Sequence, residues 1–183
     1  RCPDVINAQE GFFDVESVWP KLEQALRQAI SNLVAMRETE GSNIYGDFIK
    51  RADLIAEKLA VIEERSPQVV EEYQIRLSDR INELLAKHNQ VIEPERLLQE
   101  VAIFADRTSI TEEIVRLKSH IKQFRLIIDA DQPVGRKLDF LIQEFNREAN
   151  TIASKANDYT LAQVVVEIKA EIEKIREQIQ NIE

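Results

Sequence analysis

The chain has 183 residues, of which 44% are hydrophobic and 31% are charged, and its formal net charge is −9. Long periodic apolar runs with only 4 Gly and 5 Pro predict a soluble, all-α protein. No apolar run approaches the roughly 20 residues that a membrane span needs. The first residues show no signal-peptide pattern, and the single Cys2 cannot form an intramolecular disulfide, so we expect a reducing cytoplasm.

The acidic balance argues against nucleic acid as a partner, because phosphate contacts need a positive surface. The distribution of charge weakens this objection. Residues 106–156 contain nine Lys/Arg and eight Asp/Glu, so the acidic excess lies in the rest of the chain. The basic charge is concentrated near the stretch 135–158.

Residues 1–13 lack periodicity and open RCPDV without Met, so we expect a linker that follows a missing N-terminal domain. Residues 14–90 are predicted to form a long antiparallel helical hairpin arm. Apolar residues recur every three or four positions from Leu22 to Ile62 and again from Val70 to Leu84. Ser66-Pro67 separates the two runs, because Pro is favoured in the first turn of a helix and breaks a helix interior.

Residues 91–183 are predicted to form a C-terminal bundle of four helices. Ser109 begins a capping-box pattern at the start of the second helix. Asp158 or Thr160 caps the fourth. This last helix has the spacing of a coiled coil, whose partner can belong to this chain or to another, at Leu161, Val165, Ile168, Ile172, Ile175, Ile179 and Ile182.

The stretch 135–158 carries the most unusual polar pattern. On a helix its apolar residues share one stripe, from which only Phe140 points away. One flank of the stripe collects Asp139, Gln143, Asn146 and Asn150. The other flank collects Lys137, Glu144, Glu148, Thr151 and Lys155. An amide-lined flank indicates a hydrogen-bonded groove or a polar contact; the alternative is a solvated helix surface.

Two patterns have the chemistry of a catalytic or metal site. His120 shares a helix stripe with Glu113, Arg116 and Gln123, which fits a metal ligand or a general acid or base, or else a surface ion-pair ladder. Glu144 and Glu148 lie one turn apart and repel slightly, so a divalent cation or a facing Lys or Arg would relieve them. Oxygen ligands suit Mg²⁺ or Mn²⁺.

Other catalytic patterns are missing from the sequence, which has no Gly-rich phosphate loop, HExxH, CxxC pair or nucleophile elbow. Asp106-Arg107 is predicted to lie in a loop between helices, where functional residues gather, or to cap a helix.

Several long runs resemble a known family. VGRKLDFLIQEFNREANTIASKAND and VVEIKAEIEKIREQIQNIE are similar to the C-terminal domain of the YicC/YloC endoribonuclease family. Upstream, RCPDV, MRETEG and LLQEVAIFADRTSITEEIVRLKSHIKQF also resemble that family. The resemblance covers essentially the whole chain. One departure is Ala153, where the family pattern leads us to expect Gly. This change affects helix packing at most, and we infer no loss of activity from it.

The resemblance implies a bacterial, cytoplasmic endoribonuclease that depends on a divalent cation and assembles as a homo-oligomer, with a hexamer around a central channel as the expected form. The polar positions that match the family are Glu100, Asp106, Arg107, Glu112, Glu113, Arg116, His120, Lys137, Asp139, Gln143, Glu144, Asn146, Arg147, Glu148, Asn150 and Lys155.

Chemistry suggests roles within this set. We expect Glu144 and Glu148, with Asp139 or His120, to hold Mg²⁺ or Mn²⁺, and His120, Glu144 and Glu148 to be catalytic. RNA phosphates would be bound by Arg107, Arg116, Lys137, Arg147 and Lys155. Phe140 would stack a base or pack against another subunit, and the second is favoured. The competing hypothesis is a non-catalytic oligomerisation or scaffold module whose chemistry lies in a missing domain.

Overall fold

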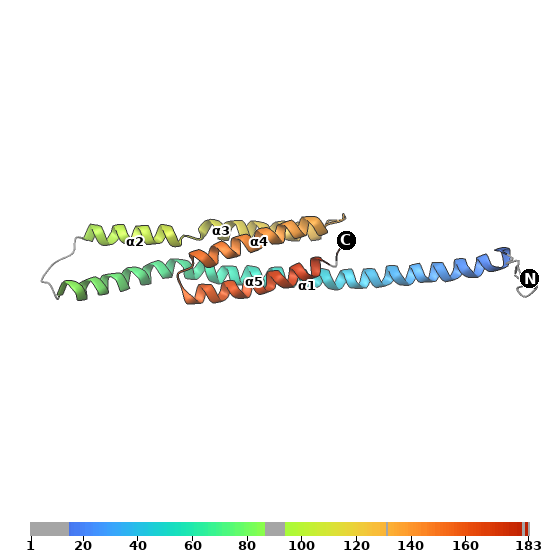
Figure 1. Cartoon of the computed structure of the whole chain (residues 1–183), viewed down its shortest axis with the longest axis horizontal. Coiled ribbons are helices and arrows are strands. Elements are labelled where there is room, and N and C mark those ends of the chain that lie inside the picture. Colours follow the sequence, from blue (N-terminus) through green and yellow to red (C-terminus); the bar gives the residue numbers. More distant parts are fainter. Residues whose placement is uncertain (1–14, 87–93, 131, 181, 183) are drawn as a thin grey trace, which may run out of the picture. The chain divides into compact units, whose positions relative to one another are not determined.

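The structure is a computed structural model that describes residues 15–86, 94–130, 132–180 and 182. These residues form five helices and no strand, which confirms the all-α prediction (Figure 1). The helices are α1 (Val15–Ala86), α2 (Pro94–Thr108), α3 (Thr111–Ile128), α4 (Gly135–Lys155) and α5 (Tyr159–Ile179). None of them combines the length and the apolar character that crossing a membrane requires. The linker predicted at 1–13 lies outside the described residues.

The predicted helix break at Ser66-Pro67 is wrong, because α1 continues through it for a total of 72 residues. A proline inside a helix costs about 3 kcal/mol. Tertiary contacts on both sides of Pro67 offset this cost, since Ile62 and Val69 are buried and Arg65 is paired with Asp158, the N-cap of α5. The predicted hairpin therefore does not turn at this point.

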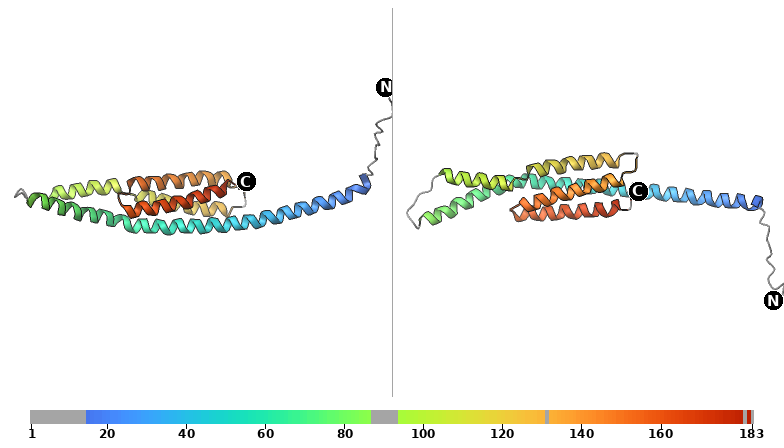
Figure 2. Two further views of the ribbon diagram at one scale, coloured as in Figure 1. Left: turned by 60° about the horizontal axis from the view of Figure 1, so that its bottom comes forward. Right: turned by 45° about the horizontal axis from the view of Figure 1, so that its top comes forward.

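The antiparallel hairpin is instead made by the last turns of α1 and by α2, which lie side by side (Figures 1 and 2). Tyr73 of α1 stacks on Phe104 of α2 with ring centroids 3.7 Å apart. No residue from Val70 to Ala86 is fully buried, and Val101 is the buried apolar residue that α2 contributes. This two-helix arm is thin and buries little more than its own seam.

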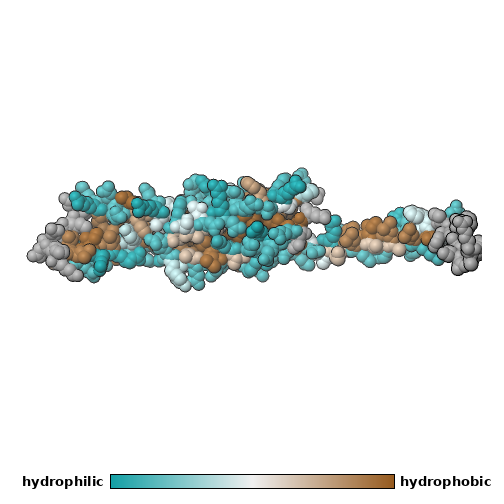
Figure 3. All heavy atoms as spheres, viewed as in Figure 1, coloured by the Kyte–Doolittle hydropathy of each residue, from teal (hydrophilic) through white to brown (hydrophobic). Residues whose placement is uncertain are grey.

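Two compact units divide the chain, Arg1–Ile44 and Tyr45–Glu183. In the first unit no residue from Glu16 to Asn43 is buried. Its helix leaves a row of large apolar side chains 44–58% exposed, visible as the apolar surface on this part of α1 in Figure 3: Val18, Trp19, Leu22, Leu26, Ile30, Leu33, Val34 and Met36. We call this row the α1 apolar stripe.

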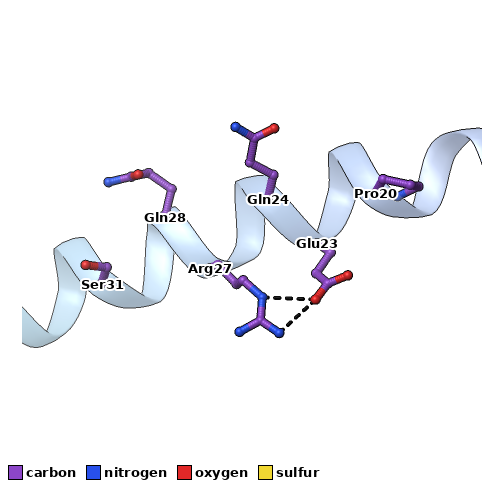
Figure 4. A pocket seen from close by; sticks show the side chains of 6 residues that line it. All are labelled: Pro20, Glu23, Gln24, Arg27, Gln28 and Ser31. Atoms are coloured by element: carbon purple, nitrogen blue, oxygen red, sulfur yellow. Dashed lines mark hydrogen bonds and ion pairs between the residues drawn. The ribbon is translucent and has the colours of Figure 1, made fainter.

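A concavity in the same unit is formed by one helix alone (Figure 4). Its lining includes Arg27, which donates from Nε and Nη2 to Glu23 Oε1 at 2.9 and 2.7 Å, as an ion pair one turn along a helix commonly does. A hollow between neighbouring side chains of a single helix encloses no ligand, so we assign it no function.

A four-helix bundle forms the core of the second unit. It differs from the predicted bundle of residues 91–183 in one member, because the middle of α1 packs against α3 and α5, at Phe48 and Arg51, and takes the place expected for α2 (Figures 1 and 2). Phe124 of α3 joins the layers, since its ring centroid lies 5.5 Å from that of Phe48 in α1 and 5.9 Å from that of Phe145 in α4. Ion pairs then fix α1 against α5 and α3.

Two of these ion pairs use basic residues of α3. Lys118 Nζ lies 2.5 Å from Glu63 of α1, and Arg125 Nη2 lies 2.5 Å from Asp53 of α1. Arg51 and Arg65 of α1 reach the other way, to Glu171 and Asp158 of α5, at 2.8 Å each. Part of the basic charge near the centre of the chain therefore holds the bundle together.

The capping prediction is confirmed at one helix start and wrong at another. Asp158 is the N-cap of α5 and accepts a hydrogen bond from the Leu161 backbone N–H at 2.9 Å. At α3 the N-cap is Ile110 rather than Ser109, and no side chain caps it. Ile110 is itself buried, so apolar packing rather than a capping box positions the start of α3.

Candidate functional site

Two polar rows face each other where α3 and α4 pack. The two helices pair along their lengths, with the apolar stripe of each turned toward the core. Residues three and four positions apart share a helix face, so the polar residues beside each stripe form a row at the edge of the contact. The rows consist of Glu113, Arg116 and His120 on α3 and of Glu144, Glu148 and Lys155 on α4.

The centre of these rows is a cluster of three possible metal ligands. One ligand atom each of His120, Glu144 and Glu148 lies within 4.8 Å of the other two. We call these three residues the HEE cluster. Glu148 is only 3% exposed, whereas His120 and Glu144 are half-buried. The cluster is thus open to solvent on one side and buried on the other.

His120 has a nitrogen that lacks a partner. Its Nδ1 is buried and makes no hydrogen bond, and its ring lies over Phe145, with centroids 6.3 Å apart. A buried polar atom without a partner is costly and calls for an explanation, such as a bound ion or water. An imidazole beside two carboxylates is a donor set that fits a divalent cation.

Two arginines approach the carboxylates without closing on them. Arg116 Nη1 lies 3.7 Å from Glu148 Oε1, and Arg147 Nη1 lies 3.7 Å from Glu144 Oε2. These distances are too long for hydrogen bonds. The facing cations therefore relieve some of the repulsion between the glutamates and leave carboxylate oxygens available. Arg116 also pairs with Glu112, which raises the pKa of its guanidinium.

A partly buried ion pair closes the far end of the rows. Lys155 Nζ donates to Glu113 Oε1 at 2.7 Å, and Glu113 is only 5% exposed. Burial raises the pKa of Glu113, but the hydrogen bond from Lys155 and the charges of Lys155 and Arg116 outweigh it and hold this pKa below its ordinary value. Glu113 is therefore a carboxylate, and its second oxygen, Oε2, is buried without a partner.

Of the remaining predicted site residues, Lys137 lies beside the cluster and Arg107 lies on another helix. Lys137 is exposed in the first turn of α4 and lines a pocket together with His120 and Glu144. Arg107 lies in the last turn of α2, because that helix extends to Thr108 and leaves no loop at 106–107. The loop predicted there is wrong.

Asp139 does not join the HEE cluster. It lies on the opposite flank of α4, accepts a hydrogen bond from Gln143 Nε2 at 3.0 Å, and lines a separate hollow with Gly135, Arg136 and Ile179. Of the two additional ligands considered from sequence, His120 lies beside the two glutamates and Asp139 does not. The reason is the helix period, because Asp139 falls five positions before Glu144 and thus on another face.

The ion-pair partners in the rows were not predictable from sequence. The stripes that contain Glu113, Arg116, Glu148 and Lys155 can be recognised from spacing, but the antiparallel register that pairs them depends on tertiary packing. With that register, Lys155 is tied to Glu113, and Arg116 stands between Glu112 and Glu148. The roles predicted for Lys155 and Arg116 in RNA binding stay predictions.

Residues 62–183 match the family described as "Endoribonuclease YicC-like, C-terminal", and residues 1–46 match the one described as "Endoribonuclease YicC-like, N-terminal region". The chain belongs to the YicC-like endoribonuclease family. The predicted resemblance is confirmed, and the whole HEE cluster lies within the C-terminal match.

Two curated relatives are similar over the full length of this chain. The "Probable endoribonuclease YicC" of Clostridioides difficile (strain 630) is 50% identical over 183 residues, and that of Haemophilus influenzae (strain ATCC 51907 / DSM 11121 / KW20 / Rd) is 37% identical. The alignments cover 100% of this chain and 62% of each YicC relative. The chain therefore spans about three-fifths of the length of these relatives.

Proposed function

We propose that this chain carries the metal site of an endoribonuclease that hydrolyses RNA phosphodiester bonds with Mg²⁺ or Mn²⁺. The observation that supports the proposal most is the HEE cluster, because three ligand atoms from two helices converge within 4.8 Å. The relatives named probable endoribonucleases support RNA as the substrate. The cytoplasm, favoured by the single Cys2, stays a prediction.

The residues present fit such an ion. Glu144 and Glu148 offer the carboxylate oxygens that Mg²⁺ and Mn²⁺ bind, and the orphaned Nδ1 marks His120 as a nitrogen donor without a competing partner. A bound divalent cation would supply Lewis acidity and lower the pKa of water. The half-buried edge of the cluster would leave one side of the ion open to the substrate.

The cations around the cluster are suited to hold RNA phosphates. Arg147 has its side chain 71% exposed and reaches toward Glu144, so its remaining N–H donors face solvent. Lys137 is exposed and lines the pocket that shares His120 and Glu144 with the cluster. A guanidinium forks onto a phosphate with two donors, while an ammonium acts as a point charge. Together they would position the backbone across the mouth of the HEE cluster.

A second candidate function is a non-catalytic module that holds copies of the protein together. The observation in its favour is the α1 apolar stripe, because exposed apolar rows of this size mark association surfaces. The family resemblance leads us to expect a homo-oligomer, with a hexamer as its form. We propose that the same stripe makes the contact between copies. This function and the catalytic one are compatible, since the stripe and the HEE cluster belong to different units.

The decisive experiment is to substitute both carboxylates of the cluster. In Glu144→Gln with Glu148→Gln we expect Mn²⁺ affinity, measured by calorimetry on this chain, to fall at least about tenfold, since even outer-shell changes cost that much. Cleavage of a labelled structured RNA with Mn²⁺ or Mg²⁺ should fall with it. Intact cleavage by the double variant would rule out the assignment.

His120→Ala tests the third ligand, and a paired control tests specificity. Loss of the imidazole should weaken Mn²⁺ more than Mg²⁺, because Mg²⁺ prefers oxygen ligands. If the affinities for both ions are unchanged while cleavage falls, His120 is a general acid or base instead. Glu173→Gln with Glu177→Gln changes two exposed glutamates one turn apart on α5, and it should leave ion affinity as it is.

A further inference from the structure

An open pocket adjoins the HEE cluster between α3 and the first half of α4. It has a volume of about 420 Å³ and shares His120 and Glu144 with the cluster. Its other lining residues differ sharply in chemistry. Ile127, Leu141 and Phe140 give it apolar walls, Gln123 adds an amide, and Arg136 and Lys137 add positive charge.

Phe140 is the residue that the core does not explain. It is 64% exposed, although α4 buries the apolar residues of its stripe on either side of this position. A large exposed aromatic ring at the wall of a pocket offers a flat apolar face to an incoming group. Unpaired nucleobases bind proteins by stacking on such faces, with a gain that is insensitive to sequence.

Arg136 and Lys137 are cations without ion-pair partners among the residues that the structure describes. Most other basic residues of the bundle are engaged, such as Lys118 with Glu63 and Lys155 with Glu113. Two exposed cations beside an apolar wall match a nucleotide, which combines a flat apolar base with an anionic phosphate.

We propose that this pocket binds an unstacked nucleobase of a single-stranded RNA segment, with Phe140 stacking on the base and Arg136 and Lys137 holding the adjacent phosphates. Gln123 then contacts the edge of the base and biases which base is accepted. The assignment rests on the proposed function. The pocket and the HEE cluster share His120 and Glu144, so the bound base would lie next to the phosphate that is cut.

A contact with a second copy of the chain is the competing use of Phe140. It fits the site less well, because a covered pocket would close the adjoining edge of the HEE cluster to substrate. The two occupants also differ in what they predict, since only the base makes RNA affinity depend on the aromatic ring.

A single-tryptophan reporter tests the proposal directly. The chain has one Trp, so Phe140→Trp in a Trp19→Phe background places the only tryptophan at the pocket. We expect a short single-stranded RNA to quench its fluorescence saturably in the presence of chelator, which removes any dependence on metal or cleavage. An abasic residue at one position of the RNA should abolish the quenching. The matched control is Val166→Trp in the same background, which is exposed on α5 and should stay unquenched.

Truncation of the ring gives the affinity. Phe140→Ala should weaken RNA binding by roughly 5- to 150-fold, the range for loss of one base–aromatic stack, and Phe140→Tyr should restore it. Gln123→Ala should shift the preferred base at the abasic-sensitive position. Phe140 is exposed, so these variants should retain the wild-type circular dichroism.

Three outcomes would overturn the proposal. These are a Phe140→Trp reporter that RNA does not quench, an unchanged affinity in Phe140→Ala, and a loss of self-association in that variant without loss of RNA binding. The glutamate double variant distinguishes a failure of this pocket proposal from a failure of the proposed metal site. If Glu144→Gln with Glu148→Gln still cuts RNA while the reporter is quenched, the metal assignment fails and the base pocket stands. The reverse result removes only the pocket.

Discussion

Asp158 connects two elements of the bundle through one carboxylate. It accepts the backbone N–H of Leu161 at 2.9 Å as the N-cap of α5, and it accepts from Arg65 Nη2 of α1 at 2.8 Å. The hydrogen bond from Arg65 is the largest cause that lowers its pKa, ahead of an opposing effect of burial and a further lowering by the cap. Arg65 also holds Glu72, so a single guanidinium spans α1 and α5 at Pro67.

The lowered pKa of Asp158 predicts acid sensitivity of the bundle. A carboxylate whose pKa is lower in the folded chain stabilises it fully above its ordinary pKa, near 4, and this contribution is lost as the pH falls through the folded value. Asp158→Asn keeps the cap and removes the charge, so we expect about 0.5–1.5 kcal/mol lower unfolding free energy at pH 7 and a difference that narrows as the pH is lowered toward 2.

Urea denaturation at both pH values measures this. Asp79→Asn is the control, because Asp79 is exposed on α1 and its substitution should change the free energy by less than about 0.5 kcal/mol. A difference between Asp158→Asn and wild type that persists unchanged at pH 2 would contradict the ion-pair explanation.

The members of the HEE cluster were predictable from sequence because each lies on a recognisable helix stripe. Whether His120 or Asp139 joins the two glutamates was left open, because spacing within one helix does not reveal which residues of another helix it faces. The same limit applies to Arg116, Lys155 and Phe140, whose surroundings depend on the register of α3 against α4. Helix periodicity therefore identifies the chemical groups, and tertiary packing decides which of them meet.

At the scale of elements, α1 shows why the predicted hairpin was wrong. The rule that proline ends a helix describes local cost, and here the burial of Ile62 and Val69 outweighs it. The place of α2 has a similar cause. Its apolar residues suggested a bundle helix, but Leu98 is exposed, whereas the stripe of α1 from Phe48 to Val69 is buried. Periodicity identifies an apolar face and leaves its partner undetermined.

Pro67→Ala tests whether the proline is tolerated at a cost. It is exposed, so the substitution should remove no packing and should restore one backbone hydrogen bond inside α1. The cost of about 3 kcal/mol for an interior proline is reduced by the greater freedom of Ala in the unfolded chain. We expect thermal or urea unfolding to show a net gain of about 1–2 kcal/mol.

The control for this experiment is Glu64→Ala, which changes an exposed residue near Pro67 to Ala without removing a proline. It should change stability by a few tenths of a kcal/mol. A loss of stability in Pro67→Ala would mean that the backbone geometry set by the proline is needed for α1 to reach both α3 and α5. The two outcomes have opposite signs, so the experiment decides between them.

At the scale of the whole molecule, the two units have different surfaces. The unit that begins at Tyr45 has a buried apolar core in the bundle and carries the HEE cluster, while residues 16–43 bury none. The family matches are divided in a similar place, with the N-terminal region ending at residue 46. A long helix with a wide apolar stripe gains stability by covering it, since a single helix buries little of its own surface.

We expect the α1 apolar stripe to pair with the stripe of a second copy. Leu22→Glu with Leu26→Glu puts charge into the stripe at little cost in helix propensity, so light scattering should show the molar mass falling to that of one 21.1 kDa chain. The control is Gln24→Glu with Gln28→Glu. It adds the same charge at the same spacing, at two residues that are not part of the stripe (Figure 4), and it should leave association intact. Burying two unpaired glutamates per copy is costly. Equal association of the leucine variant and the wild type would therefore exclude the stripe as the contact between copies.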